Sequence, residues 1–243
     1  MTRRKLLALT AVVLVGLPVG LYAFLFALQA YSAWQASRTL DRLEASRLGD
    51  PPENCDRALE HLQPEDGTHT MAAGFAYDFM RFTEWAWKVE PRLAYKVLSL
   101  ADRAGLRSWK LGAGCGIKDG RVSGVTAGLM VAGHYEMLGA GWRLASAIPD
   151  PLLKHDPDKS VATSVRFSAI DGPPNGEYVE IHATARSSPA DLAARRINRR
   201  CLLSFRGCES LCQLLPNATP LLEARDQTAF ACQPSHWNWR YEK

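Results

Sequence analysis

An uncharged apolar run near the start of the chain restricts the fold more than any other feature. Residues 6–28 carry no charge over 23 positions, and Arg3, Arg4 and Lys5 come directly before them. At about 1.5 Å of rise per helical residue, such a run crosses the roughly 30 Å hydrocarbon core of a bilayer. Basic residues that precede a transmembrane segment favour the cytoplasmic side. We therefore expect a cytoplasmic tip at residues 1–5 and a single transmembrane helix, with the bulk of the chain extracytoplasmic, either periplasmic or extracellular.

A cleavable signal peptide is the main alternative to a retained signal-anchor. The sequence Ala30-Tyr31-Ser32 would serve as a cleavage site with small residues. The apolar run is nevertheless longer than the about 7–15 residues of a usual signal-peptide core, so we expect the helix to stay. Tyr31 and Trp34 follow the run, where amphipathic rings lie well among lipid headgroups. Together with the basic tip, these two aromatic residues form the predicted membrane interface.

Residues 29–50 continue the helical pattern beyond the membrane. Apolar side chains recur there near helical spacing, and no breaker occurs before Gly49 and the two prolines that follow it. We expect a helical stalk over this range. The remaining residues 51–243 are sufficient for one extracytoplasmic domain with its own core and a cysteine-rich C-terminal section. A single span without an internal charge argues against a channel or a transporter.

Two pairs of segments show the alternation that is typical of strands. In the first, residues 109–117 alternate apolar with small or polar side chains, and an apolar run follows at 122–131. Asp119-Gly120 lies between them, and Asp-Gly between apolar runs predicts a hairpin. In the second, residues 161–169 and 178–184 flank a turn rich in Gly, Pro and Asn. We expect these hairpins to form one antiparallel sheet.

Helices are expected between and after these hairpins. A short helix is predicted within residues 52–66, whereas residues 71–89 fit a helix in part and a strand in part. A helix after Pro91 is predicted to end at Gly105. Its apolar residues at helical spacing are Leu93, Val97, Leu100 and Ala104. Ser188-Pro189 is typical of a helix start, and this helix is predicted to reach about Asn198. The mixture predicts an α+β domain in which the sheet of hairpins packs with several helices.

Six cysteines are an even number, which an oxidising compartment joins into as many as three disulfides. The disulfide candidates are Cys55, Cys115, Cys201, Cys208, Cys212 and Cys232. The last four lie within the final 43 residues, so we expect this section to be joined to itself. The sequence leaves the pairing open. Cys115 is expected either to pack on the apolar face of the sheet or to bridge to Cys55.

One cysteine pattern permits a metal site as an alternative. In Cys208-x3-Cys212-x19-Cys232-x3-His236, two thiolates and a Cys/His pair have spacings that suit tetrahedral zinc. Because an exported chain would oxidise these thiols, we prefer disulfides and expect no cofactor.

No local spacing of catalytic residues stands out. Cys115 lies among glycines, but a nucleophile elbow needs glycine two residues to each side, where Ala113 and Ile117 stand. The histidines with a nearby acidic residue are His134, His155 and His182. None belongs to a paired motif, and an isolated histidine is usually structural or exposed.

Charged and aromatic clusters favour structural roles. The net charge is +4, with a basic cluster of Arg195, Arg196, Arg199 and Arg200. Such a run usually forms a solvated helix face, so we expect no nucleic-acid partner. Six tryptophans could line a groove, but core packing or membrane contact is the preferred interpretation. These are Trp85, Trp87, Trp109, Trp142, Trp237 and Trp239.

Three short motifs carry a resemblance to other proteins. They are Lys118-Asp119-Gly120-Arg121-Val122, Cys201-Leu202-Leu203-Ser204 with Gly207-Cys208, and Leu214-Leu215-Pro216. With the basic N-terminal anchor, they resemble a group of uncharacterised bacterial membrane-anchored proteins. The resemblance implies a bacterial, exported setting and supplies no catalytic residue.

These observations lead to one functional expectation and two alternatives. We expect a single-pass, membrane-anchored extracytoplasmic domain that acts as a non-enzymatic binding or assembly module. Its partners would be the lipid bilayer and a protein at the outer face of the membrane. The alternatives are an extracytoplasmic hydrolase whose residues come from distant loops, and a zinc-binding domain built from the C-terminal Cys/His cluster.

Overall fold

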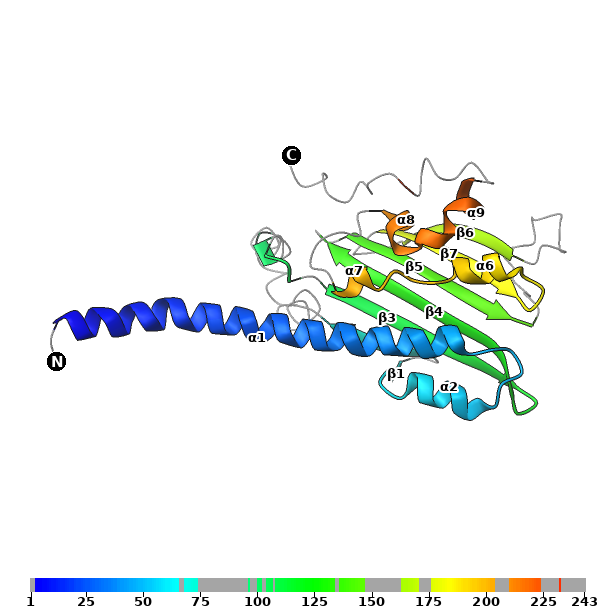
Figure 1. Ribbon diagram of the computed structural model, residues 1–243, viewed down its shortest axis with the longest axis horizontal. Helices are drawn as coiled ribbons and strands as arrows, with labels where there is room; N and C mark the ends of the chain where they lie inside the picture. The colour runs from blue at the N-terminus through cyan, green and yellow to red at the C-terminus, as the bar shows by residue number, and fades with distance from the viewer. Residues whose placement is uncertain are drawn as a thin grey trace.

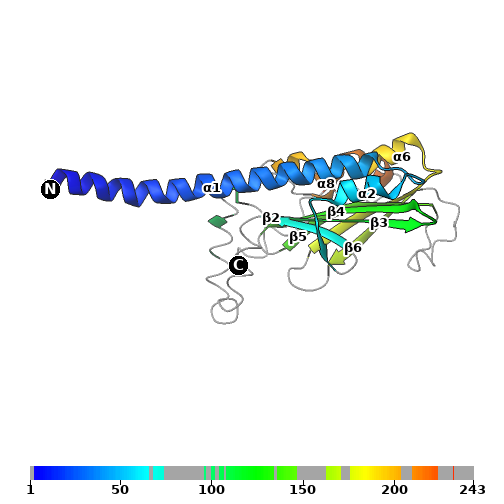
Figure 2. The same cartoon turned by 90° about the horizontal axis from the view of Figure 1, so that it is seen from below.

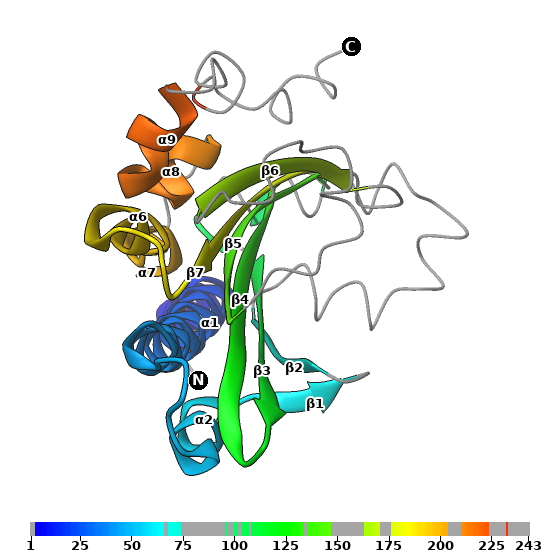
Figure 3. The same cartoon turned by 90° about the vertical axis from the view of Figure 1, so that its right-hand side faces the viewer.

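The computed structural model shows one long helix that extends well beyond a mixed sheet (Figure 1). It describes residues 3–65, 68–73, 96, 100–101, 104–106, 108–133, 136–146, 163–170, 176–203, 210–223 and 232. Within this part of the chain, the helices lie on one face of the sheet, as the end-on view shows (Figure 3). The arrangement fits the predicted α+β class.

The long helix α1 runs from Arg3 to Ala45 over 43 residues, with Pro18 inside it. One continuous helix therefore covers the predicted membrane segment and most of the predicted stalk. Its last three turns belong to the core, because four small or apolar side chains there are fully buried. They are Ala33, Ala36, Leu40 and Leu43. The residues expected to form a stalk thus pack on the sheet.

The chain leaves α1 through a tight connection to the sheet. Gly49 has a φ of +90°, a conformation that favours glycine. Its N–H donates to the carbonyl oxygen of Val122 at 2.8 Å, and the Val122 N–H donates to the Asp50 carbonyl at 2.9 Å. The helix α2 (Pro52–Leu59) follows. It is shorter than predicted, because residues 63–65 form a strand that contains Pro64.

The sheet has the strand order β1-β2-β3-β4-β5-β7-β6 among the described residues. The strands are β1 (Gln63–Glu65), β2 (Thr68–Ala73), β3 (Ser108–Lys118), β4 (Arg121–Gly133), β5 (Glu136–Ala145), β6 (Thr163–Ile170) and β7 (Gly176–Thr184). The predicted Asp-Gly turn is confirmed: Asp119 and Gly120 have φ values of +52° and +69°, and β3 pairs antiparallel with β4. Residues 74–89 of the ambiguous segment lie outside the described residues, and residues 71–73 are strand.

The prediction of a purely antiparallel sheet was wrong at one pairing. β7 pairs antiparallel with β6 as expected, but it lies parallel to β5, a strand that the sequence interpretation missed. The burial of β7 explains its inner position. Val179, Ile181 and Ala183 are buried on one face, and His182 is 2% exposed on the other. A strand that is buried on both faces lies inside a sheet rather than at its edge.

The two faces of the sheet differ in composition. Toward the helices, β5 presents Leu138, Ala140, Trp142 and Leu144, all buried. On the opposite face, the ring of Tyr178 lies close to three glycines of β4 and β5: Gly128, Gly139 and Gly141. A side chain on these glycines would occupy the space of the tyrosine ring. The glycines therefore allow β7 to lie beside β5 with Tyr178 across the strands.

Short helices complete the helical layer. The predicted start at Ser188 is confirmed, because its Oγ accepts a hydrogen bond from the Asp191 N–H at 3.1 Å. This helix, α6 (Pro189–Ala194), ends four residues before the predicted Asn198. The elements that follow are α7 (Arg200–Leu203), α8 (Leu211–Leu214), η2 (Pro216–Ala218) and α9 (Thr219–Glu223).

A glycine substitution tests the packing of Tyr178. In Gly141→Ala, the added Cβ would overlap the Tyr178 hydroxyl and lie 2.7 Å from the Ala127 carbonyl oxygen. We expect the free energy of unfolding to fall by about 1–3 kcal/mol, as for other overpacked cores. The matched control is Gly112→Ala, whose Cβ would meet nothing within 4 Å; its effect should stay within about 0.5 kcal/mol. Equal losses in urea unfolding of the two variants would contradict this packing.

Candidate functional site at the junction of the membrane helix and the domain

Between Leu14 and Leu28, α1 presents an apolar surface that the domain leaves largely uncovered. Seven large apolar side chains there are between 48% and 69% exposed: Leu14, Val15, Leu17, Val19, Leu21, Phe24 and Leu28. Among the described residues, α1 is the one helix long and apolar enough to cross a membrane. Its most apolar stretch is almost entirely uncovered by the rest of the protein. An exposed apolar surface of this extent is typical of single-pass membrane anchoring. Arg3, Arg4 and Lys5 form the start of this helix.

The two predicted interface aromatics lie where the exposed half of α1 meets the domain. Tyr31 and Trp34 are 57% and 48% exposed, and their rings stack with centroids 5.9 Å apart. The guanidinium of Arg38 lies 4.8 Å from the centre of the Trp34 ring. These residues share one helix face because their spacings are three and four. The group combines apolar rings with a cation, which suits the headgroup layer of a membrane.

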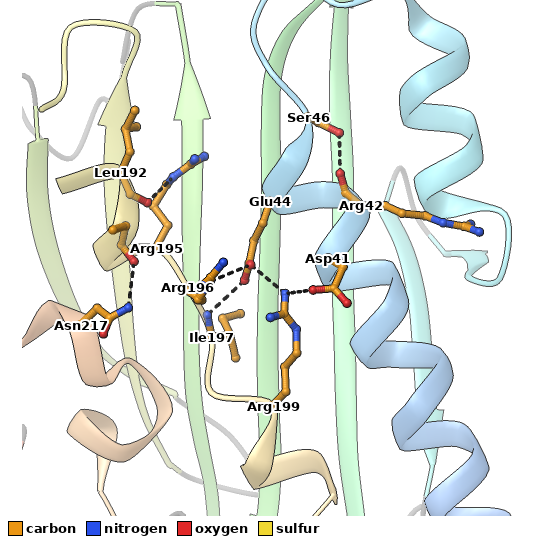
Figure 4. A network of polar contacts seen from close by, with 11 residues as sticks. Asp41, Arg42, Glu44, Ser46, Leu192, Arg195, Arg196, Ile197, Arg199 and Asn217 are labelled. Atoms are coloured by element: carbon orange, nitrogen blue, oxygen red, sulfur yellow. Dashed lines mark hydrogen bonds and ion pairs between the residues drawn. The ribbon is translucent and has the colours of Figure 1, made fainter. Parts of the chain in front are cut away.

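An ion-pair network ties the end of α1 to the C-terminal section (Figure 4). At its centre is Glu44, whose side chain is 13% exposed. Its carboxylate accepts from Arg199 Nη2 at 2.7 Å and from the Ile197 N–H at 3.3 Å. Arg199 also pairs with Asp41 Oδ1 at 2.8 Å, and Arg196 Nε lies 3.6 Å from Glu44. The contacts link α1 to residues more than 150 positions later.

The expectation that the arginine cluster forms one solvated helix face was wrong. Arg195 is 8% exposed, and its guanidinium lies 4.8 Å above the centre of the Trp142 ring. Burial lowers the pKa of Arg195, while the nearby Glu44 carboxylate raises it. Arg199 pairs with α1, so only Arg196 and Arg200 are exposed. Because α6 ends at Ala194, the four side chains do not follow a single helical periodicity.

Two disulfides join elements that are distant in the sequence. Cys55 of α2 pairs with Cys115 of β3, which is one of the two alternatives expected for Cys115. Cys212 of α8 pairs with Cys232, within the last 43 residues. Their Cα atoms are 6.4 Å and 5.0 Å apart, and Cys201 is also disulfide-bonded.

The alternative zinc set loses two ligands in this arrangement. Cys212 and Cys232 share a disulfide, and a disulfide sulfur cannot act as a thiolate ligand. Cys208 and His236 lie outside the described residues. Within the part of the chain that the structure describes, no group of three His, Cys, Asp or Glu side chains could hold a metal ion.

His182 is the one histidine of the expected acid/base set that the structure describes. Its Nε2 lies 2.9 Å from Glu180 Oε2, and its side chain is 2% exposed. Burial raises the pKa of the neighbouring Tyr178 above its usual range, and the charge of Glu180 raises it further. The buried histidine and the half-buried glutamate form a polar pair on β7. His134, His155 and Asp156 lie outside the described residues.

The described tryptophans divide between the core and the membrane junction. Trp109 and Trp142 are 2% and 0% exposed, whereas Trp34 faces outward. Four others lie outside the described residues: Trp85, Trp87, Trp237 and Trp239.

The sequence analysis missed Asp41 and Glu44. Their spacing of three places both carboxylates on one side of a helix, which was a usable signal. It did not identify Arg199 as the partner, because that contact depends on the tertiary fold.

No family model, curated protein or solved structure matches this chain. The bacterial setting therefore stays a prediction.

Removal of the Cys55–Cys115 disulfide should destabilise the domain more than removal of Cys212–Cys232. The first closes a loop of 60 residues and the second a loop of 20. The chain-entropy model gives upper values of about 4 and about 3 kcal/mol. We expect this order in the urea unfolding of the two Cys→Ser double variants; the reverse order would contradict it.

A second substitution tests the network around Glu44. Glu44→Gln removes the negative charge of the carboxylate that accepts hydrogen bonds from Arg199 and from the Ile197 N–H. We therefore expect a loss of about 1.5–3 kcal/mol in the free energy of unfolding. The control is Asp41→Asn, since Asp41 is 62% exposed and also contacts Arg199. Its loss should stay below about 1 kcal/mol. Thermal or urea unfolding with equal losses for both variants would show that Glu44 has no special role.

Proposed function

We propose that this chain is a single-pass membrane protein with a cytoplasmic N-terminus. Its domain would act at the outer face of the membrane as a non-enzymatic binding or assembly module. The observation that carries the proposal is the continuity of α1, which is exposed and apolar in its first half and part of the domain core in its second.

The continuous helix restricts how the domain can move. A flexible linker would let a tethered domain sample many orientations. Here residues 29–45 form helix up to and into the core, without a loop between membrane and domain. The domain therefore presents the same surfaces at a fixed height above the bilayer. A fixed presentation favours assembly with a neighbouring membrane protein, since little orientational freedom is lost on association.

Disulfide bonding supports an oxidising compartment outside the cytoplasm. The pairs Cys55–Cys115 and Cys212–Cys232 and the bonded Cys201 account for all the described cysteines. Such bonds persist in the periplasm or the extracellular space and are rare in the cytosol. The basic tip, Arg3 to Lys5, is consistent with this orientation.

Topology and redox state can be measured together on the full chain in its native membrane. We expect no cysteine to react with an alkylating reagent before reduction and six to react afterwards, by intact mass. With the membrane that holds α1 intact, and any outer membrane made permeable, a membrane-impermeant amine reagent should modify Lys110 and Lys118 of the domain. Six reactive thiols without reductant, or lysine modification only after the membrane that holds α1 is opened, would contradict the proposed location.

The hydrolase alternative has its own test. A broad serine or cysteine hydrolase probe should label the native protein no more than a heat-denatured control. Native-specific labelling that His182→Ala abolishes would favour a hydrolase, since His182 with Glu180 is the described pair nearest to an acid/base arrangement.

A further inference from the structure

A distant part of the domain contacts α1 within the predicted membrane segment. The Tyr22 hydroxyl donates a hydrogen bond to the Ala104 carbonyl oxygen at 2.6 Å. Tyr22 lies six residues before Leu28, which is about 9 Å along the helix axis into the uncharged run. In both side views, the short green segment around residue 100 lies alongside α1, beyond the sheet toward the N-terminus (Figures 1 and 2).

The face of α1 that packs on the domain continues down to Tyr22. At about 100° per residue, Tyr22 lies on the same side of the helix as Ala33 and Leu40 of the core. Between them, Gln29 is 5% exposed, and Leu25 and Phe26 are half-buried. The remaining large apolar side chains of this region, such as Phe24 and Leu28, are exposed. From Leu25 to Gln29, one side of α1 is therefore partly covered by protein, whereas Tyr22 itself is 42% exposed.

The segment that reaches Tyr22 directs two of its described apolar residues, Leu100 and Ala104, outward. The predicted helix face included Leu100 and Ala104, and such a face normally packs against a core. In the structure Leu100 is 69% exposed and Ala104 is exposed, whereas Ala101 is 9% exposed. Leu100 and Ala104 thus face away from the protein, whereas Leu106 is half-buried. An apolar environment would stabilise the exposed Leu100 side chain.

Several backbone polar groups at the end of this segment have partners within the protein. The Ala104 N–H donates to the Leu100 carbonyl at 2.9 Å, and the Leu106 N–H donates to the Ala101 carbonyl at 2.9 Å. Gly105 has a φ of +85°, as in a glycine-terminated helix end. The Ala104 carbonyl accepts from Tyr22. Irregular backbone is tolerated at membrane depth when its polar groups find partners in the protein, and these groups do.

We propose that the described residues of this segment, Lys96, Leu100, Ala101 and Ala104 to Leu106, form a second membrane contact, which lies in the outer leaflet at the boundary between headgroups and acyl chains. This rests on the proposed membrane anchoring of α1. Lys96 is exposed one helical turn before Leu100, and Asp102, Arg103 and Arg107 are nearby in the sequence. Charges at this density exclude a second membrane crossing and suit an amphipathic segment in the interface, whose long basic side chains reach the headgroups.

Spin-label depth measurements test the proposal on the full chain in phospholipid vesicles. A nitroxide would be attached to Leu100→Cys, with the six native cysteines left in disulfides. Leu21→Cys, at a 60% exposed position of α1, serves as the bilayer control, and Ile117→Cys, at a 47% exposed position of β3, serves as the water control. We expect the Leu100 label, like the Leu21 label, to collide more with oxygen than with a water-soluble nickel complex. The Ile117 label should show the opposite preference.

The controls distinguish failure of this inference from failure of the anchor. A Leu21 label in lipid with a Leu100 label in water would overturn the second contact alone. Both labels in water would overturn the anchoring as well. Tyr22→Phe keeps the ring and removes the donor, so it should shift the Leu100 label toward water. If the depth of the Leu100 label were unchanged in that variant, the Tyr22 hydrogen bond would not be what holds this segment at the membrane.

Discussion

The structure depends on a single helix, α1, which exposes an apolar surface in one part and packs in the protein core in another. Between Leu14 and Leu28, α1 exposes large apolar side chains, and its last turns bury Ala33, Ala36, Leu40 and Leu43 against the sheet. Two of these are alanines, which allow the helix to approach the strands closely. Because no loop separates the halves, the apolar face of the sheet is covered by the same element that meets the bilayer. The domain cannot tilt on the membrane without bending this helix or uncovering its own core.

On the opposite face of the sheet, small residues determine which strand lies next to β7. Gly128, Gly139 and Gly141 leave room for Tyr178, so β7 lies against β5 and the β6–β7 pair joins the sheet through its second strand. A hairpin motif alone does not say which of its strands will be central. β7 is the central strand because side chains on both of its faces are buried, including His182.

Local signals in the sequence predicted local structure well. The uncharged run, the Asp119-Gly120 turn and the Ser188 helix start each depend on a few adjacent residues, and each lies where expected. The strand β5 was missed although Leu138 to Leu144 alternate, because two of the positions between them, Gly139 and Gly141, are glycines rather than polar residues. The Glu44–Arg199 pair and the outward Leu100 depend on contacts far away in the sequence, which periodicity does not contain.

The geometry of α1 also relates the two groups that we assign to the membrane surface. Tyr22 and Tyr31 are nine residues apart, which at about 100° per residue places them on opposite sides of the helix. The segment that bonds Tyr22 lies on the domain side, whereas Tyr31, Trp34 and Arg38 lie on the free side. A helix that is held at the interface from one side only can still rotate about its axis. Contacts on both sides oppose that rotation, so the domain would keep one edge of its sheet directed along the membrane.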